Sequence, residues 1–233
     1  MGRLKELVSR SAKKMMSTSA IKENDDVVLD SLYNCNTYPL LLILSGPSGV
    51  GKDMVARRLI ERRPESFYFV VTATTRPPRH DEVHGVDYLF VSNDEFARMI
   101  ETNELLEHAI VYNDYKGIPK QQIRDALVSG RDVILRVDVQ GAHTVRSLVP
   151  NSVSVFLATQ TEEGLVDRLQ QRKQDTAEGM ALRTATARQE MKRMWEFDYC
   201  VINPEGQPDV AVDQVLSIID AEHCRISQEP VEL

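Results

Sequence analysis

Cysteine is scarce in this chain. The three cysteines, Cys35, Cys200 and Cys224, are odd in number and lie far apart, and no two of them form a Cys-x-x-Cys pair. The pattern therefore indicates neither a disulfide framework nor a zinc site, since both need cysteines that pair or cluster. It fits a reducing compartment.

Long apolar runs and an excess of positive charge are also missing. The longest apolar run, Pro39–Leu44, is of strand length, whereas a membrane-spanning helix needs about 20 apolar residues. The formal net charge is −7 and the isoelectric point is about 5.3. Because nucleic-acid and anionic-membrane binders need a positive field over one face, we expect neither partner. An anionic ligand would have to meet a local cluster of cations.

The composition, with 42% hydrophobic and 27% charged residues, is that of an ordinary protein with one substantial core. Residues 1–38 read as an appended leader, which begins basic and turns acidic at Glu23–Asp26. It is either a targeting segment, since transit peptides are basic and amphipathic, or a tail without that function. We expect one catalytic domain over residues 39–225 and a short tail over residues 226–233.

Short apolar runs alternate with helix-period segments from Pro39 onward. Strands that are apolar on both faces and separated by helices predict an α/β fold with a parallel five-stranded sheet covered by helices. Turn residues interrupt this rhythm between Arg76 and Val111, where we expect a small inserted lobe. The predicted strands are Leu40–Leu44, Phe67–Thr72, Asp132–Val137, Ser152–Leu157 and Tyr199–Ile202, and the predicted helices are 52–63, 93–102, 119–129, 139–148, 162–172, 178–195 and 207–223.

A glycine-rich loop joins the first predicted strand to the first predicted helix. Glycines let successive backbone N–H groups turn toward a phosphate, and the helix N-terminus adds its positive dipole end. Lys52 then reaches the β and γ phosphates as a point charge. This pattern predicts a site for an ATP-type triphosphate. Its residues are Gly46, Pro47, Ser48, Gly49, Val50, Gly51 and Lys52.

The position after the lysine departs from the phosphate-loop pattern, which places Ser or Thr there to hold Mg²⁺. This chain has Asp53. A carboxylate is itself a hard oxygen ligand and could bind magnesium directly or through water. The alternative is that Asp53 only stabilises the helix N-terminus, where negative charge is favoured.

A second cluster of functional residues lies in the loop that follows Thr72. Arg76 and Arg79 are three residues apart in a proline-stiffened segment, and Tyr88 follows. Paired guanidinium groups with a phenol are suited to holding a phosphate monoester by charge-assisted hydrogen bonds. A basic loop in solvent is the alternative.

Taken together, these motifs resemble those of the guanylate kinase family, in family order, from about Leu40 to about Glu222. Lys52–Asp53 and the segment Tyr115–Pro119 resemble the plant organellar branch of that family. The motifs that carry the resemblance are Ser45–Lys52, Thr74–Arg79, Glu82–Gly85, Asp87–Tyr88, Leu106–Ala109 and Asp138–Gly141.

The resemblance implies a P-loop kinase fold with a GMP-binding lobe at about 72–118 and an arginine-rich lid at about 168–183. Guanine presents adjacent N–H donors that a carboxylate can accept together, which suits Glu107. Two positions depart from the family: Lys116 replaces a phosphate-binding tyrosine, and Ile118 replaces a serine that contacts guanine. By resemblance, Arg76, Arg79 and Tyr88 hold the GMP phosphate, Thr72, Glu107 and Asp138 face the guanine, and Arg168, Arg172 and Arg183 surround the transferred phosphoryl group beside Lys52.

A further departure lies in the predicted strand that ends at Asp138. The family commonly has Asp-x-Asp there, and the first of these two positions is Arg136 in this chain. Residues two apart on a strand face the same side, so Arg136 should point toward the metal side of the site. We therefore expect an exchange of charges in which Asp53 supplies the carboxylate and Arg136 pairs with it.

These inferences predict Mg²⁺-dependent transfer of the ATP γ-phosphoryl group to GMP, and also to dGMP, by a monomer. Two alternatives are a nucleoside monophosphate kinase of other base specificity and a catalytically silent binding module of the same fold. Resemblance to the plant branch favours a plastid or mitochondrion, and the cytoplasm is the alternative.

Overall fold

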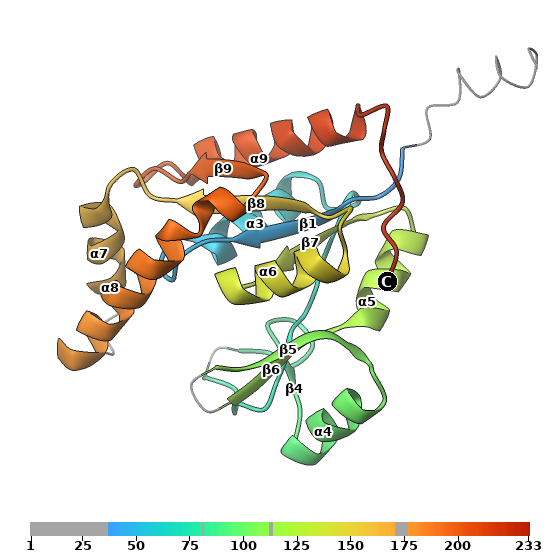
Figure 1. Ribbon diagram of the computed structural model, residues 1–233, viewed down its shortest axis with the longest axis horizontal. Helices are drawn as coiled ribbons and strands as arrows, with labels where there is room; N and C mark the ends of the chain where they lie inside the picture. Colours follow the sequence, from blue (N-terminus) through green and yellow to red (C-terminus); the bar gives the residue numbers. More distant parts are fainter. Residues whose placement is uncertain (1–36, 81, 112–113, 171–176) are drawn as a thin grey trace, which may run out of the picture. The chain divides into compact units, whose positions relative to one another are not determined.

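The computed structural model describes residues 37–80, 82–111, 114–170 and 177–233. Residues 1–36 of the predicted leader lie outside the described residues, as does Arg172 of the predicted lid. Tyr38–Leu233 form one compact unit. Its main sheet has five parallel strands in the order β2-β7-β1-β8-β9, which confirms the predicted α/β sheet (Figure 1). The strands are β1 (Leu41–Ser45), β2 (Phe67–Phe69), β7 (Asp132–Arg136), β8 (Val153–Ala158) and β9 (Tyr199–Ile202).

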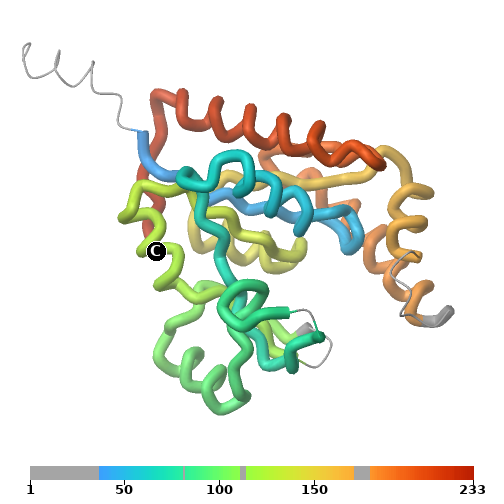
Figure 2. The backbone as a smooth tube through the Cα atoms, turned by 180° about the vertical axis from the view of Figure 1, so that it is seen from behind, coloured from blue at the N-terminus to red at the C-terminus, as the bar shows by residue number. Residues whose placement is uncertain are grey.

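Helices cover both faces of this sheet because its strands are apolar on both sides. Leu42 and Leu44 of β1 pack with α3 and α9, whereas Leu41 and Ile43 pack with α5 and α6. The two helix layers are visible from opposite sides in Figures 1 and 2. The bounds of these helices are α3 (Lys52–Arg62), α5 (Lys120–Val128), α6 (Val139–Leu148) and α9 (Pro208–His223).

The inserted lobe is a second sheet with strand order β4-β3-β6-β5, covered by one helix. Ser92 begins that helix, α4, because its side chain accepts a hydrogen bond from the N–H of Glu95 at 3.1 Å. Phe96 and Met99 of α4 then bury their side chains against the lobe's strands. The bounds are β3 (Ala73–Thr74), β4 (Leu89–Phe90), α4 (Asn93–Glu101), β5 (Leu105–Val111) and β6 (Asp114–Pro119).

The second predicted strand ends earlier than expected. We predict Phe67–Thr72, but β2 stops at Phe69. The side chain of Gln122 hydrogen-bonds both backbone groups of Val71 instead, accepting from the N–H at 2.9 Å and donating to the carbonyl at 3.0 Å. A side chain that satisfies both backbone groups removes the need for a strand partner. The chain is thereby free to turn into the lobe.

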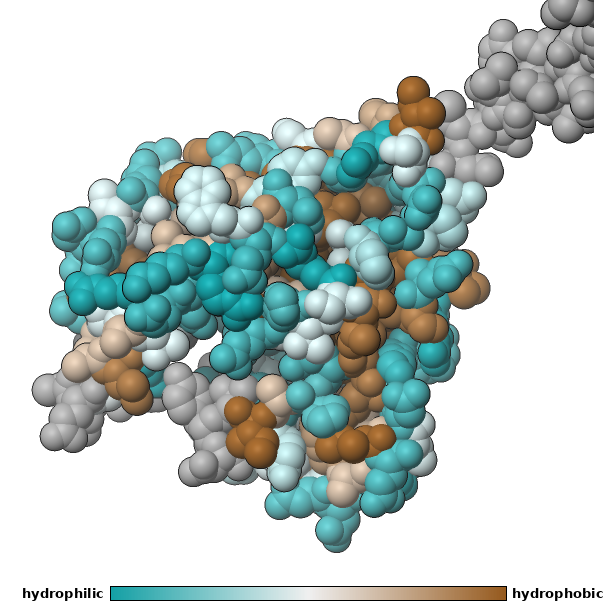
Figure 3. Space-filling view, in the orientation of Figure 1, coloured by the Kyte–Doolittle hydropathy of each residue, from teal (hydrophilic) through white to brown (hydrophobic). Residues whose placement is uncertain are grey.

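The C-terminal tail packs against the domain. The side chain of Gln228 exchanges hydrogen bonds of 3.0 and 2.7 Å with the backbone of Tyr38. Val231 and Leu233 pack against the core beneath α5 and α6. In Figure 3, apolar surface gathers near α5 and this tail, while most of the rest of that face is hydrophilic. Among the described helices, none is long and apolar enough to cross a membrane.

Two helices and a short 3-10 turn follow β8, where we expect the lid. They are α7 (Glu162–Gln170), α8 (Ala177–Lys192) and η1 (Met194–Glu196). Leu165 and Leu169 of α7 pack against Ala187 of α8. The predicted helix at 162–172 is therefore described only to Gln170, and the predicted helix at 178–195 is α8 with a 3-10 turn after it.

Candidate active site

The loop between β1 and α3 wraps around the side chain of Lys52. Its ammonium group donates to the carbonyl oxygens of Gly46, at 2.5 Å, and Pro47, at 3.0 Å. Burial of this group lowers the lysine pKa to about 8, although the charges of Glu190 and Asp53 oppose the shift. A phosphate bound by the loop could replace these two carbonyl oxygens as the partner of the ammonium group.

Three glycines of the loop, Gly46, Gly49 and Gly51, have backbone conformations that other residues rarely adopt. Gly46 has a φ of 137°, and a Cβ there would lie 2.2 Å from the carbonyl oxygen of Leu157. Gly51 has a φ of 98°, and its Cβ would lie 2.6 Å from the amide nitrogen of Asn203. The glycines thus allow both the turn and its close packing against the ends of β8 and β9.

A cavity of about 300 Å³ opens on this loop and joins it to the inserted lobe. Such a shared cavity is what a transfer between two bound substrates requires. The predicted site residues that line it are Ser48, Gly49, Gly51, Lys52, Asp53, Thr72, Tyr88, Glu107, Lys116 and Asp138, together with Ile118, Arg136 and Glu190.

Glu107 of β5 and Asp138, which lies between β7 and α6, both line the cavity. Burial raises the pKa of Glu107 to about 7, and the charge of Asp138 adds to the shift. Asp138 also caps α6, since its Oδ1 accepts from the N–H of Gly141 at 2.8 Å. Asp138 therefore caps α6 and lines the cavity at the same time. Ile118 is buried in the core and offers this cavity only apolar surface.

Cations surround the ring of Tyr88. The guanidinium carbon of Arg76 lies 5.3 Å from the ring centroid, and the ammonium of Lys116 lies 5.8 Å from it. Arg76 also pairs with Glu82 at 2.8 Å. Arg79 lies farther out: its side chain is 69% exposed, and it lines a neighbouring cavity that shares Tyr88, Asp53 and Arg136.

Arg136 and Asp53 form the predicted ion pair. Arg136 ends β7 beside the last residues of β1, so its side chain reaches the first turn of α3. Its second terminal nitrogen donates to the Tyr88 hydroxyl at 3.2 Å. One arginine therefore contacts both the phosphate-loop helix and the lobe's tyrosine.

The predicted lid residues have different surroundings. Arg168 donates to the backbone carbonyls of Val50, at 3.1 Å, and Asn203, at 2.9 Å. It thus holds the outer side of the phosphate loop. Arg183 lies on α8, half-buried.

The sequence reasoning missed Glu190 of α8. Its carboxylate accepts from the N–H of Ser48 at 3.3 Å. Burial raises the pKa of Glu190, although the positive charge of Lys52 acts to lower it. It also missed Asn203, whose side chain donates to the carbonyl of Val50 at 2.8 Å. Neither residue belongs to the loop motif, because both reach it from elements more than 130 residues away.

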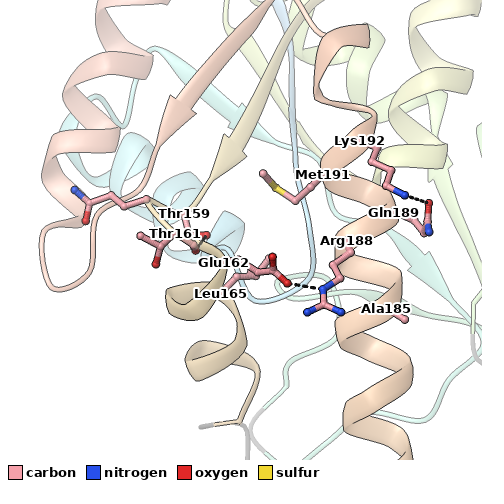
Figure 4. A pocket seen from close by; sticks show the side chains of 10 residues that line it. Thr159, Thr161, Glu162, Leu165, Ala185, Arg188, Gln189, Met191 and Lys192 are labelled. Carbon is pink, nitrogen blue, oxygen red and sulfur yellow. Dashed lines mark hydrogen bonds and ion pairs between the residues drawn. The ribbon is translucent and has the colours of Figure 1, made fainter.

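A larger cavity, of about 620 Å³, lies between α7 and α8 (Figure 4). Arg188 of α8 pairs with Glu162 of α7 at its edge. Among the described residues, none of the predicted site residues lines this cavity.

Three comparisons agree on the relatives of this chain. The family model described as guanylate kinase matches residues 38–222. A protein of Oryza sativa subsp. japonica named "Guanylate kinase 2, chloroplastic/mitochondrial" is 54% identical over 84% of this chain and 68% of its own length. A guanylate kinase of Lactobacillus johnsonii is 42% identical over 80% and 91%. Among solved structures, guanylate kinase from Anaplasma phagocytophilum matches with a TM-score of 0.67 and 27% identity, over 83% of this chain and 90% of the other.

Proposed function

Because this chain belongs to the guanylate kinase family, we propose that it transfers the γ-phosphoryl group of ATP to GMP, and also to dGMP, giving ADP and GDP. It is a nucleoside monophosphate kinase. The observation that carries the proposal for this chain is the single cavity onto which Lys52 and Glu107 both open. One residue suits a triphosphate, and the other suits guanine.

The donor end is the phosphate loop. Its backbone N–H groups and Lys52 bind the β and γ phosphates, and the lysine exchanges the carbonyls of Gly46 and Pro47 for phosphate oxygens. Glu190 holds the N–H of Ser48 until the nucleotide arrives. The carboxylate and the phosphates then compete for the same donor.

Magnesium fits this site as a partner of the nucleotide. No group of three or more His, Cys, Asp or Glu side chains that could hold a metal is present among the described residues. Proteins usually bind Mg²⁺ through one or two carboxylates together with substrate phosphates. Asp53 is the carboxylate beside Lys52, and its side chain is 63% exposed. The bound ion would neutralise charge on the phosphates, with Asp53 holding it directly or through water.

The acceptor base lies against Glu107, Thr72 and Asp138. A guanine base offers its N1–H and N2–H₂ groups side by side, and an ionised carboxylate accepts both. Adenine would place its N1 acceptor against that carboxylate and leave the buried carboxylate without a hydrogen-bond partner. The site therefore rejects adenine by this cost as much as it attracts guanine. Ile118 packs against the base without a hydrogen bond.

The acceptor phosphate lies near Tyr88, with Arg76, Arg79 and Lys116 supplying charge. Arg168, Arg172 and Arg183 then stabilise the transferred group, whose charge spreads over three equatorial oxygens in the transition state. The protein forms no covalent intermediate. It positions two polyanions and removes their repulsion.

An ADP-release assay with GMP, dGMP, AMP, UMP and dTMP as acceptors tests the proposal. We expect turnover with GMP and dGMP only. Turnover with AMP or a pyrimidine nucleotide would show a kinase of other base specificity. No turnover with any acceptor, in a folded protein that binds GMP, would show a silent binding module.

For the compartment, the printed name of the rice relative supports a plastid or a mitochondrion. We expect a fluorescent protein fused to residues 1–38 to enter one of these organelles. A diffuse cytoplasmic signal would contradict this assignment.

A further inference from the structure

The strongest feature outside the proposed set of site residues is Arg136. Its charge and position are fixed: a guanidinium group stays protonated in proteins, and the Arg136 side chain is only 19% exposed. Its guanidinium carbon lies 5.4 Å from the ring centroid of Phe69 and 5.6 Å from that of Tyr88. Two aromatic rings thus hold the guanidinium group in place.

The two hydrogen bonds of Arg136 point to opposite halves of the site. One terminal nitrogen contacts Asp53, on the first turn of the phosphate-loop helix. The other donates to the hydroxyl of Tyr88, on the inserted lobe, at 3.2 Å. A guanidinium fork can donate two parallel hydrogen bonds to phosphate oxygens, a bidentate geometry that the compact ammonium of a lysine does not provide.

The arginines near Tyr88 differ in where their carboxylate partners lie, and this difference argues against the other cations as the sole ligands of the acceptor phosphate. Arg76 is already paired with Glu82, and both side chains are largely buried. Asp53, the partner of Arg136, is instead 63% exposed and belongs to the donor side. Of these two arginines, Arg136 is therefore the one whose carboxylate partner lies on the donor side of the site.

We propose that Arg136 is a binding residue for the phosphate of the acceptor nucleotide, beside Tyr88, and that it is more than a counter-ion for Asp53. The inference rests on the proposed function, since it takes GMP as the acceptor. In this arrangement one cation lies between the donor's helix and the acceptor's phosphate. It lowers the repulsion between the two substrates from within the sheet.

Calorimetric titration with GMP, without metal or ATP, tests this directly. Arg136→Met keeps the aliphatic stem and removes the charge, and we expect roughly 10- to 100-fold weaker GMP binding, the range for a lost hydrogen bond to a charged group. Arg136→Lys should recover part of the loss. Arg58→Met is the matched control, because Arg58 pairs with Asp209 of α9 and lines none of the cavities near Tyr88.

Guanosine provides the second arm, because it has the base and ribose of GMP without the phosphate. Ligand-observed NMR should show that Arg136→Met leaves guanosine binding unchanged. An equal loss for guanosine and GMP would overturn the proposal, because it would indicate a distorted base site. Thermal unfolding of each variant, together with its guanosine binding, checks that the site is still folded.

The counter-ion explanation is tested in an Asp53→Asn background. If Arg136 only neutralises Asp53, Arg136→Met should have no effect on GMP binding once that carboxylate is gone. We expect the loss to persist at a similar factor, because the phosphate remains. If the unmodified chain does not bind GMP at all, the proposed function itself fails, and that outcome is distinct from GMP binding that ignores Arg136.

Discussion

Guanine recognition by Glu107 should depend on pH within the physiological range. Burial, reinforced by Asp138, raises the pKa of this carboxyl to about 7. Only the ionised form can accept both guanine N–H donors, and the protonated form places a donor against them. The pKa is raised, so the binding-competent form is lost as pH falls through about 7.

The size of the effect follows from the pKa. With a pKa of about 7, roughly nine tenths of Glu107 is ionised at pH 8 and roughly one tenth at pH 6. Apparent affinity scales with the competent fraction, so the Glu107 contribution predicts about tenfold weaker GMP binding at pH 6 than at pH 8. Binding of guanine should itself lower the carboxyl pKa, because it adds hydrogen bonds to the ionised form.

Glu107→Gln is the matched variant, since its amide does not titrate. GMP binding by calorimetry should be weaker at pH 8, by about 10-fold or more, because one acceptor and the charge are lost. The phosphate of GMP also titrates, with a pKa of about 6, but this affects both proteins equally. The ratio of the two dissociation constants should therefore shrink about tenfold between pH 8 and pH 6. A ratio that stays constant would refute the reasoning about Glu107.

Three further predictions concern the phosphate loop. Asp53→Ser and Arg136→Asp should each lower kcat/KM, and the loss in the double variant should be smaller than the sum of the two single losses by about 1–3 kcal/mol, since Asp53→Ser removes the carboxylate partner of Arg136 and Arg136→Asp places a second carboxylate beside Asp53; strict additivity, in activity and magnesium dependence, would rule out the coupling. Glu190→Gln should strengthen ATP binding by about 1 kcal/mol, roughly fivefold, because it removes a negative charge beside the triphosphate site and a neutral amide oxygen competes less strongly for the N–H of Ser48; weaker binding in a filter assay would mean that Glu190 supports the loop instead. Gly51→Ala should lower stability by about 1–3 kcal/mol more than Gly130→Ala in thermal unfolding, because both have positive φ but only Gly51 meets a neighbour; equal losses would show that Asn203 yields.

Local pattern determined much of this protein. The five strands, the phosphate loop and most helix positions can be read from the sequence, because apolar periodicity and turn residues act within a few residues of the chain. The pairing of Arg136 with Asp53 could also be anticipated. It followed from the family's Asp-x-Asp pattern, which Arg136 interrupts, together with the two-residue period of a strand and the loop motif beside it, and the ion pair confirms it.

The tertiary structure alone decided which distant residues complete the site. No local pattern places Glu190 on Ser48, Asn203 on Val50 or Arg168 on the loop's outer side. Those contacts depend on the strand order β2-β7-β1-β8-β9, which sets β8 and then β9 on one side of β1 and so brings the segments that follow these two strands to the loop. Strand order is a property of long-range packing, and many orders satisfy the same periodicity. The sequence therefore determined the chemistry of the loop, and the fold selected the side chains that surround it.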